Sequence, residues 1–188
     1  MLDTFKNQTG RLIRALTEAS ELHQQIAQVV EQLRTVFTQG GKILVAGNGG
    51  SATLAQHLSD EMVGRYRMSR PPLPVIALSA DTAVLTCIGN DFGFEQIFAR
   101  QVEALGQKGD VLLLFSSSGR SPNILAAAEQ ARSQQITVIG FCGEDGPLES
   151  LADIAVVPNS TDPPRIQELN LHAIHLICEA FDPKSSSG

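Results

Sequence analysis

Residues 43–51 read Ile43-Leu44-Val45-Ala46-Gly47-Asn48-Gly49-Gly50-Ser51, and this pattern indicates the fold class of the chain. A short apolar run ends directly in a glycine-rich loop, and a helical pattern over residues 52–62 follows it. Four more apolar runs lie downstream, at residues 75–78, 111–115, 136–140 and 154–157. Because these runs are continuous rather than alternating, and residues 122–134 are again helical in pattern, we predict a doubly wound α/β fold with a five-stranded parallel sheet flanked by helices.

The regions on either side of this core are predicted to be helical. Apolar residues recur at steps of three and four between Phe5 and Phe37, which predicts two helices or one bent helix before the sheet. This segment could pack on the sheet or form an oligomer interface. An amphipathic helix is expected over residues 165–181. We therefore expect a single domain with a helical segment at 1–40, a core at 41–182 and a flexible tail at 183–188.

Composition excludes several classes of function. The chain has 188 residues, a net charge of -6 and no apolar run long enough for a membrane span, so neither a nucleic acid nor a membrane is an expected partner. The N-terminus lacks the residue order of a secretory signal, which favours the cytoplasm. Cys87, Cys142 and Cys178 have no Cys-x-x-Cys spacing and apolar neighbours, so buried free thiols are expected.

Two loops at predicted strand ends point to an anionic ligand. In such sheets ligands bind at the carboxyl ends of the strands. Glycines in residues 47–50 let the backbone approach a ligand, and Ser51 could cap the following helix. The second loop, residues 116–122, carries four serines and a proline suited to a helix start, which is typical of a phosphate cradle. Neither loop has a Walker or dinucleotide pattern, so no nucleotide cofactor is expected. The alternative is that both are ordinary strand-to-helix turns.

Polar residues on two helices form a third constellation. His57 and Glu61 are four residues apart and share a helix face, where they could hold a metal or a substrate. Gln167 and His175 are eight apart, which returns to within about 80° of the same direction on a helix. Taken alone, His57 could instead lie on a solvated helix face, and His175 could be a core histidine. His23 and His172 are interpreted as structural.

Together these motifs resemble the phosphoheptose isomerase family of the sugar isomerase (SIS) superfamily. The resemblance runs from the first helix to the last, and its motifs occur in order at residues 47–51, 57–61, 64–67, 89–94, 116–121 and 165–168. It implies an SIS-type, flavodoxin-like sheet and an enzyme that interconverts sedoheptulose 7-phosphate and D-glycero-D-manno-heptose 7-phosphate, a step toward the heptose of bacterial lipopolysaccharide or S-layer glycans. It also implies a homotetramer and one zinc ion per subunit.

The resemblance assigns roles residue by residue. Glu61 is the expected base and His175 the expected acid of an isomerisation through an enediol or enediolate. The expected zinc ligands are His57, Glu61, Gln167 and His175. The expected substrate-binding residues are Asn48, Gly49, Gly50, Ser51, Glu61, Arg65, Asn90, Asp91, Ser116, Ser117, Ser118, Ser121 and Gln167.

Some positions depart from the family pattern. Arg120 stands where asparagine is frequent, and Pro164 stands where an aspartate is usual, with Asp162 as a possible replacement. Two other kinds of protein would have the same fold and phosphate loop. One is a non-catalytic tetramer that binds the bacterial replication initiator, and the other is a sugar-phosphate sensor. The presence of His57, Glu61 and His175 favours the enzyme.

Overall fold

The computed structural model describes residues 1–183. Its centre is a parallel sheet of five strands in the order β2-β1-β3-β4-β5, which is the flavodoxin-like order. All neighbouring strands pair in parallel, with Ile43 opposite both Val75 and Val111. The strands are β1 (Ile43–Gly47), β2 (Val75–Ala77), β3 (Val111–Ser116), β4 (Thr137–Cys142) and β5 (Ile154–Val156). The predicted fold class and strand positions are thereby confirmed.

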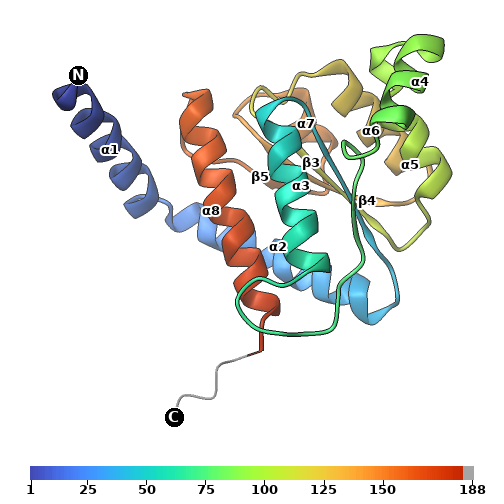
Figure 1. The fold of residues 1–188 in the computed structure, drawn as a ribbon, viewed down its shortest axis with the longest axis horizontal. Coiled ribbons are helices and arrows are strands. Elements are labelled where there is room, and N and C mark those ends of the chain that lie inside the picture. Colours follow the sequence, from blue (N-terminus) through green and yellow to red (C-terminus); the bar gives the residue numbers. More distant parts are fainter. Residues whose placement is uncertain (184–188) are drawn as a thin grey trace.

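Helices cover both faces of the sheet (Figure 1). One face packs against α2, α3 and α8, through side chains such as Val45, Leu113 and Phe115. The other packs against the helices between β2 and β5, through alternate strand residues such as Leu44 and Leu112. The helices are α1 (Leu2–Thr17), α2 (Ser20–Thr38), α3 (Gly50–Val63), α4 (Thr82–Phe92), α5 (Ala99–Leu105), α6 (Pro122–Ser133), α7 (Pro147–Leu151) and α8 (Pro163–Phe181). Burial on both faces explains why the strands are continuously apolar.

The N-terminal segment forms two helices rather than one bent helix. The break falls at Glu18 and Ala19, and Gly10, which punctuates the sequence pattern, lies inside α1. Helix α2 buries its apolar stripe against the sheet and α8. In the part of the chain that the structure describes, α1 has no buried residue, and it stands away from the body (Figure 1). Arg165 ties α1 to α8 by donating to the carbonyl of Gln8 at 3.3 Å.

Several features were not predicted. Helices α4, α5 and α7 were not predicted, because they are short or their apolar periodicity is weak. They cover the face of the sheet opposite α3 and α8. Residues 184–188, most of the predicted tail, lie outside the described residues. The division of the chain into the three predicted segments stays a prediction. Within residues 1–183, no helix has both the length and the apolar character needed to cross a membrane.

Candidate active site

The glycine loop and the serine loop meet at the switch point of the sheet. Strand β1 lies between β2 and β3, so the chain leaves β1 toward one face and β3 toward the other. Gly49 adopts φ +54°, a left-handed conformation that favours glycine. The amide of Ser51 donates to the carbonyl of Asn48, and the amide of Ala52 donates to the carbonyl of Gly49, which closes the turn. Ser51 does not cap α3 as expected: Gly49 is the N-cap, and Ser51 is buried inside the first turn.

Serine hydroxyls and backbone amides form the second side of the site. Ser116 ends β3 and is 5% exposed, and Ser121 precedes α6, whose first residue is Pro122 as predicted. The Oγ atoms of Ser116 and Ser117 are buried and have no hydrogen-bond partner among the described residues. Ser121 occupies the N-cap position without making a capping bond. Buried hydroxyls without partners are uncommon in proteins, and these are available to bind a ligand.

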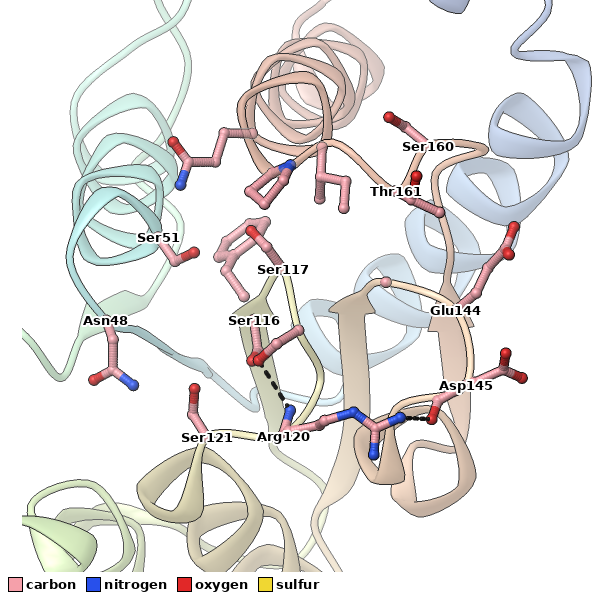
Figure 2. A pocket seen from close by; sticks show the side chains of 16 residues that line it. Asn48, Ser51, Ser116, Ser117, Arg120, Ser121, Glu144, Asp145, Ser160 and Thr161 are labelled. Carbon is pink, nitrogen blue, oxygen red and sulfur yellow. Dashed lines mark hydrogen bonds between the residues drawn. The ribbon is translucent and has the colours of Figure 1, made fainter.

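The two loops line one open cavity of about 570 Å³ (Figure 2), called here the serine cleft. It is lined by Asn48, Ser51, Phe115, Ser116, Ser117, Ser118, Arg120, Ser121, Gly143, Glu144, Asp145, Ser160, Thr161, Pro163, Ile166 and Gln167. Asn48 is held by two hydrogen bonds of 2.8 Å with the buried amide of Asn123. Hydroxyl and amide groups therefore surround a space suited to a polar, anionic ligand.

The loop after β4 supports the serine loop from outside. Gly119, at φ +61°, and Gly146 approach each other so closely that a Cβ on Gly146 would come within 2.8 Å of the Gly119 Cα. The amide of Leu148 donates to the carbonyl of Gly119 at 3.1 Å. The conformation of the serine loop thus depends on a segment that lies about 25 residues further along the chain.

Gln167 joins helix α8 to the serine cleft. Its amide lies against Gly50, where an added Cβ would come within 2.9 Å of the Gln167 Oε1 atom. His175, on the same helix, is eight residues away, about 12 Å along the axis. In this chain Gln167 thus lies with the serines, and its predicted place among the zinc ligands stays a prediction.

A second set of polar groups, the histidine cluster, lies further along α3 and α8. The Nε2 atom of His57 is 3.0 Å from the Nε2 of His175 and 3.9 Å from the Oε1 of Glu61. The other ring nitrogen of His57, Nδ1, is 3.4 Å from the exposed carboxylate of Asp60. Two imidazole nitrogens and a carboxylate oxygen therefore face one another, and Asp60 lies beside the outer nitrogen of His57.

The segment after α3 packs against the histidine cluster and against the end of α8. The ring of Tyr66 packs against His175 with centroids 5.5 Å apart. Asp182, just beyond α8, accepts hydrogen bonds from the amides of Arg67 and Met68, both at 2.9 Å. Burial opposes ionisation of Asp182, but these two amides and the Arg70 guanidinium outweigh it and hold its pKa below the ordinary value.

Arg70 adds the last contacts of this segment. Its ion pair with Asp182 is called here the brace. Its guanidinium donates to the carbonyls of Glu61 and Met62 at 2.8 Å, which satisfies the end of α3, and its Nε lies 3.4 Å from Asp182. Both side chains of this ion pair are 4% exposed. The ends of α3 and α8, the helices that carry the histidine cluster, are therefore fixed to each other.

Comparison with known proteins agrees with this geometry. Residues 4–143 match the SIS domain family. A phosphoheptose isomerase from Pelobacter propionicus is 47% identical over 97% of this chain and 97% of its own length, and one from Trichlorobacter lovleyi is 47% identical over 87% and 84%. The structure of a phosphoheptose isomerase from Francisella tularensis superimposes with a TM-score of 0.92 at 39% identity, covering 96% of this chain and 97% of that one. This chain belongs to the phosphoheptose isomerase family. It is an enzyme, an isomerase of sugar phosphates.

Six residues expected to bind substrate do not line the serine cleft of this isomerase. Gly49 and Gly50 belong to the glycine loop at the start of α3, and Glu61 lies in the histidine cluster. The other three are Arg65, Asn90 and Asp91. Arg65 is exposed on the segment that follows α3. Asn90 and Asp91 are exposed near the end of α4, and the Asn90 amide donates to Asp91 at 2.7 Å. The roles of these three residues stay predictions. Asp162 is the N-cap residue before α8 and pairs with Arg11 at 3.0 Å, so its carboxylate already contacts a cation.

Other residues of the enzyme's site were missed from the sequence. Ser160 and Thr161 line the serine cleft from the loop after β5, and Glu144 and Asp145 line it from the loop after β4. Their positions at the carboxyl ends of strands could have identified them. By contrast, no local signal marked Asn123 as the partner of Asn48.

The thiols of the enzyme are partly as predicted. Burial raises the pKa of Cys142 and of Cys178 to about 12, and the nearby carboxylates Glu149 and Glu61 contribute, so these thiols are protonated and unreactive. The expectation was wrong for Cys87, which is exposed on α4 because that helix lies at the rim of the fold.

Proposed function

We propose that the enzyme interconverts sedoheptulose 7-phosphate and D-glycero-D-manno-heptose 7-phosphate. The observation that carries this proposal is the separation of two chemically different clusters along the α3–α8 seam. Ser51 and Gln167 reach the serine cleft, while His57 and His175 lie further along the same two helices. In this heptose the phosphate and the reacting carbons are at opposite ends of the carbon chain, so an anion site apart from an acid–base site suits it.

The serine cleft is the proposed phosphate site. Hydroxyls of Ser116, Ser117, Ser118 and Ser121 and free amides at the start of α6 would bind the phosphate oxygens. Asn48, Gly49, Gly50, Ser51 and Gln167 would bind the sugar nearby. We propose that Arg65, Asn90 and Asp91 complete the sugar contacts, as the family resemblance implies.

The histidine cluster is the proposed acid–base site. Isomerisation of the ketose requires removal of a proton from C1 and delivery of a proton to C2, while the oxygens of the enediol exchange their protons. Glu61, whose side chain is 20% exposed, would move the carbon-bound proton. His175 would donate a proton to one oxygen and accept one from the other. The Asp60 carboxylate beside Nδ1 of His57 would favour the orientation in which Nε2 faces Glu61 and His175.

The donor set of the histidine cluster fits a zinc ion. His57, Glu61 and His175 bring nitrogen and carboxylate donors together, and His57, Asp60 and Glu61 offer ligand atoms within 4.8 Å of one another. We propose that His57, Glu61 and His175 hold one ion per subunit, with Gln167 as the fourth ligand implied by the resemblance. When bound, zinc would stabilise negative charge on the enediolate oxygens.

We also propose that the enzyme is a cytoplasmic homotetramer. Within residues 1–183, helix α1 has no buried residue, and it exposes Leu2, Phe5 and Ile13, an apolar face that a second copy could cover. Light scattering coupled to size-exclusion chromatography measures the assembly directly. A monomer at micromolar concentration would contradict this part of the proposal.

The decisive experiment is turnover of sedoheptulose 7-phosphate by the purified protein, with added zinc and with chelator. Glu61→Gln is expected to lower kcat by at least about 100-fold while the fold is retained, because a general base contributes that much or more. Glu129→Gln, on the exposed face of α6, is the matched control and should leave kcat unchanged. Sugar-phosphate binding without turnover under any metal condition would instead favour the initiator-binding or sensor function.

A further inference from the structure

The serine cleft carries an uneven distribution of charge. Of the residues that line it in the described part of the chain, Arg120 is the one cation, while Glu144 and Asp145 are carboxylates. Serine hydroxyls and amides stabilise an anion through their dipoles, but they carry no net charge. A phosphate monoester with nearly two negative charges therefore enters a cleft in which two carboxylates repel it and one guanidinium attracts it.

The position of Arg120 is defined at both ends of the residue. Its amide donates to the Oγ of Ser118 at 3.2 Å, and its guanidinium donates to the backbone carbonyl of Asp145 at 2.6 Å. The side chain therefore extends along the rim from the serine loop to the loop after β4 (Figure 2). A carbonyl is neutral, and within residues 1–183 Arg120 makes no ion pair, so its charge is not cancelled by a carboxylate.

We infer that Arg120 is a substrate-binding residue that supplies the counter-charge for the phosphate group in the serine cleft. It offsets the repulsion by Glu144 and Asp145 and makes the cleft selective for phosphorylated over unphosphorylated sugars. The buried hydroxyl of Ser116 in the same cleft has no hydrogen-bond partner in the described part of the chain, and this independently indicates a ligand there. This inference rests on the proposed function, because it assumes that the cleft receives the phosphate.

The test measures the dissociation constant of inorganic phosphate by calorimetry, and then steady-state kinetics with sedoheptulose 7-phosphate. In Arg120→Asn, both the dissociation constant and KM should rise about tenfold, while kcat changes by less than about twofold. Arg120→Lys restores the charge and should return both values to within about threefold of the native protein. Added salt should weaken phosphate binding more in the native protein than in Arg120→Asn.

Lys108→Asn is the matched control, because it removes one exposed positive charge just before β3, at the opposite edge of the sheet from the serine loop. It should leave phosphate binding unchanged. Equal phosphate binding by the native protein and Arg120→Asn would overturn the role of Arg120. Equal weakening in the Asn and Lys variants, with a lowered melting temperature, would also overturn it, because Arg120 would then only tie the two loops together. Failure of the native protein to bind phosphate would contradict the proposed function itself.

Discussion

The serine cleft and the histidine cluster both contact α3 and α8 but are built in different ways. The cleft is formed by loops at strand ends, so its groups come from consecutive residues such as 116–118 and from backbone amides. The histidine cluster joins side chains that are 118 residues apart in the chain. The proposed binding in the cleft is therefore spread over many groups that each contribute modestly, whereas the proposed chemistry depends on a few side chains whose distance is set by helix packing.

The sharpest test of this contrast compares two histidines one turn apart on α8. His175→Gln removes the proposed acid from the cluster and should lower kcat by about 100-fold or more, with KM changed little. The ring of His172 faces His23 rather than His57, so His172→Gln should keep kcat within about threefold of the native value. Equal losses of kcat in the two variants would mean that both substitutions disturb helix α8, and would contradict a specific role for the imidazole of His175.

The next test concerns the brace that sets the distance within the histidine cluster. Asp182→Ala leaves the Arg70 guanidinium buried without its carboxylate, and should lower the free energy of unfolding by about 3 kcal/mol. The exposed pair of Arg67 and Glu179 is the matched control, and Arg67→Ala should cost less than about 1 kcal/mol. Urea unfolding monitored by circular dichroism measures both. A small loss in Asp182→Ala would mean that α3 and α8 hold their positions without the brace.

A smaller effect is expected in the serine cleft. Ser117→Ala removes a hydroxyl that has no hydrogen-bond partner among residues 1–183, so the free energy of unfolding should be unchanged. The KM for the sugar phosphate should rise about fivefold, the value of one hydrogen bond, with kcat retained. Steady-state kinetics and thermal melting measure these quantities, with Ser133→Ala at the end of α6 as the control. A collapse of kcat in Ser117→Ala would break the proposed separation of binding from chemistry.

The smallest expected effect is a pH dependence of stability at the α2–α8 contact. Burial, followed by the nearby charges of His23 and His175, lowers the pKa of His172 from 6.5. The unfolded chain therefore binds more protons just below this value, so the free energy of unfolding should fall as the pH drops below about 6.5. His172→Gln should reduce this slope between pH 5 and 6.5 and leave stability at pH 8 unaffected. An unchanged slope in urea titrations would assign it to other groups.

The serine cleft could be predicted in large part because it follows from local sequence and topology. A glycine loop and a serine loop after continuous apolar runs place Asn48, Ser51 and Ser116 at the carboxyl ends of adjacent strands. Ser160 and Thr161 were missed although the strand before them was predicted, because the loop after β5 has no run of glycines or serines to mark it. The histidine cluster was only partly predictable: helical spacing pairs His57 with Glu61, but spacing along one helix says nothing about the rotation of α8 against α3.

The sheet, the order of the motifs and the two loops that line the serine cleft follow from the sequence, because continuous apolar runs and glycine or serine turns are local signals. Three contacts depend on the packing of the folded chain: His57 with His175, Gln167 with Gly50 beside the serines, and Arg120 with Asp145. The physical reason is that each of these contacts joins residues from separate elements. Their distances depend on how whole helices and loops pack, and no local propensity encodes that packing.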